Sequence, residues 1–169
     1  MAIAQSMLPE FDQEAAATRR VLEQVPDDHL AWQPHEKSMT LGRLASHIAE
    51  IPDWGVMALT RDSVDIEPTD GEQRTAANYG STEEIVAAFD ESTASAREVI
   101  AAAEDDVFMQ PWSLLRGGEE VFSAPKIGVL RSFVMNHCVH HRGQLTVYLR
   151  LLDAHVPSTY GPSADEAAF

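Results

Sequence analysis

The sequence contains little cysteine and no long apolar run. Its single cysteine, Cys138, cannot form an internal disulfide bond. No segment approaches the ~18 consecutive apolar residues that a membrane-spanning helix needs. The first residues show neither the basic region nor the long apolar region of a secretory signal. We therefore expect a protein of the reducing cytoplasm that does not enter a membrane.

Basic residues are also scarce. Lys and Arg number 12, whereas Asp and Glu number 27, which gives a formal net charge of −15. Proteins bind duplex DNA largely through Lys and Arg side chains that neutralise phosphates. We therefore exclude nucleic acid as a partner, and anionic membrane surfaces on the same grounds. A charge of this size is otherwise typical of a well-solvated surface, and we expect a small-molecule substrate.

What the sequence does contain is a clear helical pattern. Its 169 residues, of which 44% are hydrophobic, suffice for a packed core, and we expect a single domain over 1–169. Apolar residues recur at helical spacing in four stretches, which run from about residue 5 to 25, 40 to 61, 81 to 105, and 123 or 125 to 153. Four helices with one or two long connections predict an all-α four-helix bundle.

Local signals mark where these helices start and break. Thr40 is a favourable N-cap residue, and Ser81 followed by Glu84 fits a capping box. Pro52 predicts a kink in the second helix, because proline removes one hydrogen bond and clashes with the preceding turn. Three segments should lack helix: a polar connection over 62–80, a small hairpin at Gly117-Gly118, and an irregular tail over 155–169.

Two histidines of the last helix lie within its apolar stripe. Residues of a helix advance by about 100° each, so His141 lies about 40° from His137 on the helix surface. Leu130 and Tyr148 lie about 20° from His137, on the same side. A packed core would be expected to place leucine or valine at the two histidine positions.

A third histidine has the same kind of position on the second helix. Relative to His47, Ile51 lies at about 40°, Trp54 at about −20° and Ala58 at about 20°. His47 therefore also lies on an apolar face. Three histidines on two amphipathic helices are thus predicted to face a shared interior.

A buried imidazole needs a partner for each ring nitrogen. Two histidines four residues apart on a helix, with a third from a facing helix, can bind one metal ion. We therefore predict that His47, His137 and His141 bind one divalent metal. Three neutral nitrogen ligands leave at least one open position, which is the pattern of a catalytic rather than a structural site. The alternative is that the three are hydrogen-bonded core histidines.

Other polar residues near this face receive lesser roles. Gln144 lies about 20° from His137 and can hydrogen-bond a ligand or a bound water. Glu50, one turn after His47, can orient a histidine or act as a base. His140, at the edge of the stripe, can donate to a ligating residue. A purely structural role, or simple exposure, is the alternative for each of the three.

Two neighbours are expected to lie off this face. Cys138 is about 100° from His137, and a lone cysteine usually fills a small space in the core. Arg142 points away from the metal face, where an ion pair with one of the many carboxylates is the expected role.

Several segments of the chain resemble the DinB/YfiT-like metalloprotein superfamily. The most specific are residues 136–145 (NHCVHHRGQL) and the ending at 156–166 (VPSTYGPSADE). Residues 32–34 (WQP) and 40–47 (TLGRLASH) are similar to the family's first histidine region. The resemblance covers nearly the whole chain. It implies a four-helix bundle in up-down-down-up order, often as a homodimer.

The same resemblance implies a divalent metal, nickel, zinc or a similar ion, on three histidines that match His47, His137 and His141. Some members of the family are thiol-dependent transferases or isomerases that use bacillithiol, mycothiol or glutathione. The resemblance therefore implies the fold and the metal site more strongly than the reaction.

Our leading hypothesis is a metal-dependent transferase or isomerase that activates a low-molecular-weight thiol, since a bound cation lowers the pKa of a coordinated thiol. Two alternatives stay open. One is a metal-dependent hydrolase that activates water instead. The other is a non-catalytic metal- or ligand-binding stress protein, and a solvent-accessible cavity beside the histidines would count against it.

Overall fold

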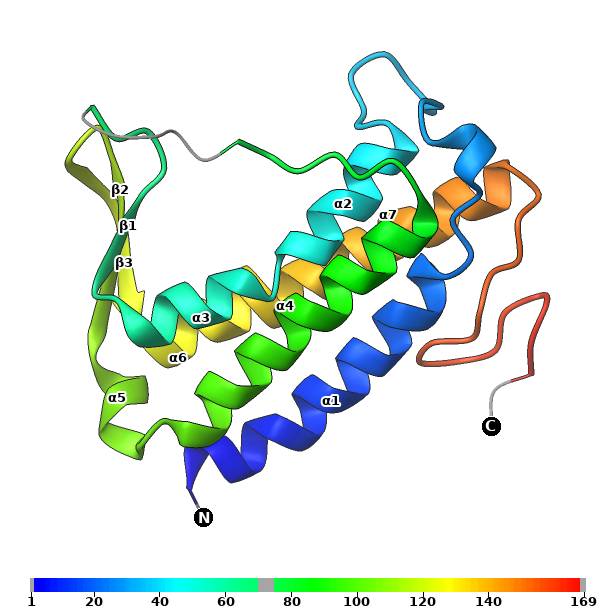
Figure 1. Ribbon diagram of the computed structural model, residues 1–169. Coiled ribbons are helices and arrows are strands. Elements are labelled where there is room, and N and C mark those ends of the chain that lie inside the picture. The colour runs from blue at the N-terminus through cyan, green and yellow to red at the C-terminus, as the bar shows by residue number, and fades with distance from the viewer. Residues whose placement is uncertain (1, 70–74, 168–169) are drawn as a thin grey trace.

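The structure, a computed structural model, describes residues 2–69 and 75–167 (Figure 1). Its elements are, in chain order, α1 (Ile3–Leu22), a 3₁₀ turn (Asp27–His29), α2 (Leu41–Glu50), α3 (Asp53–Thr60), β1 (Ser63–Asp65), α4 (Thr82–Ala102), α5 (Asp105–Met109), β2 (Pro111–Arg116), β3 (Glu119–Pro125), α6 (Lys126–Val129), a π-helical segment (Leu130–Asn136) and α7 (His137–Leu151). The protein is mostly helical, as predicted.

The long helices lie side by side, and the small sheet lies at one end (Figure 1). Helix α1 packs against α4 and α7, and α2 packs against the same two helices. Their apolar stripes supply the core, which includes Phe11, Leu44, Phe89 and Leu149, all buried. Among the described residues, no helix is both long enough and apolar enough to cross a membrane.

The predicted helix starts are formed by the residues named for them. The Thr40 hydroxyl accepts a hydrogen bond from the backbone N–H of Arg43 at 3.2 Å. The Ser81 hydroxyl accepts one from the N–H of Glu84, also at 3.2 Å. The Glu84 carboxylate accepts from the N–H of Gly80 at 2.7 Å. The capping arrangement therefore reaches one residue further upstream than the capping-box pattern implies.

Pro52 ends a helix where a kink was expected. Because proline has no N–H, the chain tightens at this point, and the N–H of Ile51 bonds the carbonyl of Ile48 at 3.3 Å. The carbonyl of Ala49 accepts from the Ser92 hydroxyl at 2.7 Å, so helix α4 satisfies a backbone group near the break. The predicted second helix is thus two helices, α2 and α3.

The expectation of an all-α fold is wrong in one respect, because a three-stranded sheet is present. The predicted hairpin is found: β2 and β3 are antiparallel around Gly117 and Gly118, whose φ angles of 60° and 83° suit glycine. Strand β1 was not predicted. It lies in the connection taken as purely polar, and it pairs in parallel with β2 through Ser63 and Ser113.

The last helical stretch begins close to the predicted position but is not uniform. Its middle, Leu130–Asn136, is π-helical. Such segments are rare in proteins, and those that occur are often found near functional sites. On an ideal α-helix Met135 would lie about 160° from His137. Met135 is nevertheless buried, because that side of the helix faces α1, where Met135 lines the same small cavity as Phe11 and Cys138.

The tail after α7 contains no helix or strand over residues 155–167, as predicted. It is held by ion pairs, of which Arg150 with Asp165 measures 2.7 Å. The Tyr160 hydroxyl donates to the Glu14 carboxylate at 2.7 Å. These contacts tie the tail to α1 and α7.

Candidate metal centre

The structure brings the three predicted histidines together between α2 and α7. The Nε2 atom of His137 lies 2.9 Å from Nε2 of His141 and 3.4 Å from Nε2 of His47. One ring nitrogen from each histidine lies within 4.8 Å of the other two. Figure 1 shows α2 and α7 next to each other along this stretch.

These distances fit a single divalent ion. Nitrogen ligands about 2.05 Å from zinc lie about 2.9 to 3.3 Å apart, depending on whether the angle at the metal is right or tetrahedral. The separations measured from His137 fall close to this range. The three ring nitrogens, all within 4.8 Å of one another, could therefore hold one divalent metal ion.

The environment keeps the three rings neutral, which is the form that binds a metal. Burial lowers the pKa of His47 to about 4, and the charges of His141, His137 and Arg43 act in the same direction. Burial is also the largest cause that lowers the pKa of His137 and of His141. At neutral pH each ring therefore offers an unprotonated nitrogen.

Hydrogen bonds on the far side of the rings set which nitrogen is unprotonated. Nδ1 of His141 donates to Oε1 of Gln144 at 2.7 Å, so its Nε2 is left as the acceptor. The Gln144 amide nitrogen donates to Nε2 of His140 at 3.2 Å. The backbone carbonyl of Phe133 accepts a hydrogen bond from the His137 ring. Gln144 thus contacts a candidate ligand, and His140 contacts Gln144.

Glu50 was considered as a group that orients a histidine or acts as a base, but its hydrogen-bond partners are Arg43 and Ala77. Its carboxylate accepts from Nη1 of Arg43 at 3.4 Å and from the N–H of Ala77 at 3.0 Å. Glu50 therefore anchors the segment around Ala77, which precedes α4. It also lines the same cleft as His47.

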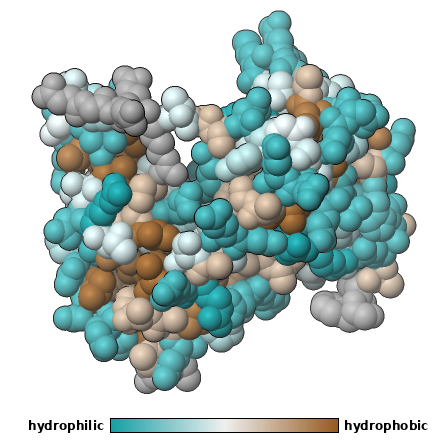
Figure 2. Space-filling view, in the orientation of Figure 1, coloured by the Kyte–Doolittle hydropathy of each residue, from teal (hydrophilic) through white to brown (hydrophobic). Residues whose placement is uncertain are grey.

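That cleft, of about 200 Å³, opens beside the histidines. Helix α2 contributes Arg43, His47 and Glu50 to it, and Trp54 and residues 64–66 form the facing wall. In Figure 2 the surface is hollowed between the sheet and α2. Arg43 was not among the predicted site residues, although its position four residues before His47 puts the two on one helix face.

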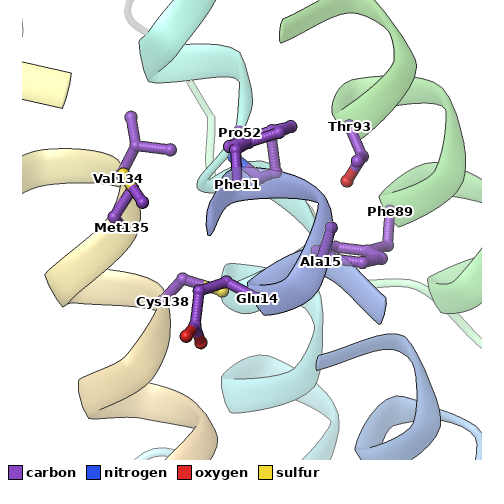
Figure 3. A pocket seen from close by; sticks show the side chains of 9 residues that line it. All are labelled: Phe11, Glu14, Ala15, Pro52, Phe89, Thr93, Val134, Met135 and Cys138. Atoms are coloured by element: carbon purple, nitrogen blue, oxygen red, sulfur yellow. The ribbon is translucent and has the colours of Figure 1, made fainter. Parts of the chain in front are cut away.

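Cys138 and Arg142 lie off the histidine face, as expected. Cys138 points into a small core cavity of about 20 Å³, where Figure 3 shows it near Glu14 of α1. Its thiol lies 3.4 Å from the Thr18 hydroxyl. Arg142 is buried and forms an ion pair with Glu14 at 2.7 Å. Both side chains therefore serve the packing of α1 against α7.

The fold and the site together define a mostly helical protein with a three-histidine cluster that can hold a divalent metal ion. The chain belongs to the DinB family, whose model matches residues 1–168.

Individual relatives agree with this assignment. YrdA of Bacillus subtilis (strain 168), an uncharacterized protein, is 28% identical over 163 residues, which cover 95% of this chain and 90% of YrdA. A DinB-like protein from Bacillus cereus superposes with a TM-score of 0.73 at 22% identity, covering 94% of this chain and 98% of its own. YjoA, a DinB-like protein from Bacillus subtilis, gives a TM-score of 0.65 at 16% identity, with 91% and 97% covered. These two solved structures support the fold alone.

Proposed function

We propose that this protein is a metal-dependent enzyme whose divalent ion, zinc or nickel, is held by His47, His137 and His141. We further propose that it uses a low-molecular-weight thiol in a transfer or isomerisation reaction on a small molecule. The observation that carries the proposal is the convergence of three neutral ring nitrogens beside a cleft. A structural metal site would be expected to have four protein ligands and no cleft.

The residues of the chain have separate tasks in this proposal. The three histidines stay neutral because they are half-buried or buried, so no proton has to be displaced near pH 7. Gln144 holds the His141 ring in the tautomer that presents Nε2. A divalent cation bound there would lower the pKa of a thiol at its open position and make a thiolate available at neutral pH.

The runner-up is a metal-dependent hydrolase with water in the open position, which needs the same three ligands. A non-catalytic binding protein is less well supported, since the cleft beside His47 is accessible to small molecules. Assays with thiols separate the first two readings.

The first test is metal content. We expect the protein, purified without an affinity tag, to carry about one divalent ion per chain. His47→Ala and His141→Ala should lose it. His35→Ala is the matched control, because His35 is exposed and lies in a loop. Equal metal in all four proteins would refute the assignment.

The second test is turnover. The metal-loaded protein is assayed with bacillithiol, mycothiol and glutathione against a generic electrophile. Turnover with one of them that is lost in His141→Ala supports the thiol reaction. No turnover with any of them, together with hydrolysis of ester substrates, would replace it with the hydrolase reading.

We also propose that the packed helices form a four-helix bundle in up-down-down-up order, and that the protein is a homodimer. The contacts of α1 and α2 with α4 and α7, and the path of the chain in Figure 1, support the first statement. Sedimentation velocity tests the second, and a single species of one-chain mass would contradict it.

A further inference from the structure

The described lining of the cleft beside His47 combines apolar side chains with the guanidinium of Arg43. We propose that it binds a small organic acid, whose carboxylate lies at Arg43 and whose apolar body lies against Trp54, Val64 and Ile66. This inference rests on the proposed function, because the acid would be a substrate or cosubstrate delivered to the ion that the histidines hold.

The apolar wall comes from two parts of the chain. Trp54 is half-buried on α3 and stacks edge-on with Trp112, at a ring-centroid distance of 6.5 Å, and with Phe133, at 6.2 Å. Val64 and Ile66 are half-buried beside it on the β1 side. Packing on both sides fixes this wall before any ligand binds, which lowers the entropy cost of binding.

Arg43 is the cation on the opposite wall, and it is held in place. Its Nη1 donates to the carbonyl of Ala77 at 3.2 Å and to Glu50 at 3.4 Å. Among residues 2–69 and 75–167, these are the hydrogen bonds that the guanidinium makes. Nε and Nη2 form the edge of a guanidinium that binds a carboxylate with two parallel hydrogen bonds. The described contacts leave that edge to a ligand.

Among the residues that the structure describes, two carboxylates line the cleft, and both are already engaged. Glu50 accepts from Arg43 and from the backbone N–H of Ala77. Asp65 accepts from the N–H groups of Gly117 and Gly118 at 3.1 and 2.7 Å, and from that of Glu67 at 3.0 Å. Asp65 therefore faces the hairpin turn with one charge stabilised by three donors, and it does not cancel the charge of Arg43.

Electrostatics and size point to the same class of ligand. Arg43 lies four residues before His47 on the same helix face and lines the same cleft, so a divalent ion on the three histidines would add positive charge beside it. Glu50 pairs with Nη1 of Arg43 and leaves the Nε–Nη2 edge of the guanidinium as the place where an anionic group can bind. A cleft of about 200 Å³ lies below the ~300–1,000 Å³ typical of drug-sized sites.

Calorimetric titration of the zinc-loaded full chain tests the proposal. The probes are phenylacetate and its neutral isostere phenylacetamide. We expect phenylacetate to bind about tenfold or more tightly than phenylacetamide, as a charge-assisted bidentate contact predicts. Arg43→Gln should remove this preference, and Arg43→Lys should retain part of it. Glu50→Gln should tighten phenylacetate binding, because it removes the competing carboxylate.

Arg97→Gln is the matched control, because Arg97 pairs with Asp12 on the surface between α1 and α4. Zinc content and thermal midpoint are measured for every variant. Equal affinity for the two probes, or phenylacetate binding that survives Arg43→Gln, would overturn the proposal. If the wild-type chain takes up no zinc, the proposed function fails. The same titration on the metal-free chain then tests separately whether the cleft binds the acid, since the contact between Arg43 and the carboxylate does not require the ion.

Discussion

Replacing Gln144 with leucine tests whether the residues around the histidines prepare them for a metal. The Gln144 amide oxygen accepts from Nδ1 of His141 at 2.7 Å, which leaves Nε2 of that ring facing His137. Leucine has a similar volume but no acceptor. The His141 ring can then rotate or take the other tautomer, so a metal ion has to select the competent arrangement from several.

The expected loss of affinity follows from the contacts. Partners of ligating histidines typically contribute 10–100-fold in metal affinity, or about 1.4–2.7 kcal/mol. Two features place Gln144 in the lower half of this range. His141 is only 8% exposed, so packing also restrains its ring. Gln144 itself is exposed, so water can replace part of the lost bond. We expect Gln144→Leu to weaken zinc binding by roughly 10–30-fold.

A second substitution separates this role from packing. Gln144→Glu keeps an oxygen acceptor and makes it anionic, so the affinity should equal or exceed that of the wild type. The assay is competition with a chromophoric zinc chelator at neutral pH, with cobalt absorption as a check on geometry. Gln5→Leu, an exposed change at the start of α1, is the control. A folded Gln144→Leu protein within twofold of the wild type, or an equal loss in Gln144→Glu, would refute the reasoning.

Three further predictions concern stability. Because burial lowers the pKa of His47 to about 4, the unfolded chain binds more protons between that value and the ordinary pKa of 6.5, so the free energy of unfolding of the metal-free protein should rise with pH across this window. Denaturant titrations at several pH values check this, and His47→Gln should show a shallower slope. An equal slope in the two proteins would contradict the assignment. Arg142→Met should destabilise the protein by about 3 kcal/mol, because it leaves the mostly buried Glu14 carboxylate with the Tyr160 hydroxyl but without its cation, and the double variant with Glu14→Gln should recover part of the loss. A loss below about 1 kcal/mol in urea unfolding would show that the pair is solvated. Asp65→Ala should speed hydrogen exchange at the amide of Gly118, whose N–H donates to that carboxylate at 2.7 Å, without affecting exchange in the helical core. Unchanged exchange at Gly118 would show that Asp65 does not stabilise the hairpin turn.

Much of the candidate site could be predicted because it depends on helical phase. His47, His137 and His141 each interrupt an apolar stripe. A polar ring at such a position is predicted to face the interior of the protein. The partner of Gln144 follows from the same arithmetic, since residue 144 lies one turn after His141. Each of these relations spans at most a few residues of one helix. The stripes alone do not decide that α2 meets α7, because α1 is buried in the same core and packs against α4 and α7.

The features that were missed depend on distant parts of the chain. Strand β1 is three residues long, and it exists because Ser63 pairs with Ser113 and Asp65 with Leu115, which no local pattern encodes. The π-helical segment, Leu130–Asn136, directly precedes His137. It leaves no mark in the apolar spacing. Arg43 differs, because its spacing from His47 is a local signal, whereas the cleft that both residues line also needs residues 64–66 from the β1 connection.

The site therefore draws on two kinds of structure that can vary independently. The ring nitrogens belong to α2 and α7, which are fixed by core packing along their whole length. The facing wall of the cleft belongs to α3 and to the connection that contains β1, which carries less of the core. A relative that kept the helices but changed this connection would keep the three histidines and lose the Val64–Ile66 wall. In the proposed function, α2 and α7 would therefore set the metal site, whereas the connection that contains β1 would set the ligand. In this chain the residues that would select the ligand are Arg43 and Trp54, and they are where a comparison of substrates should begin.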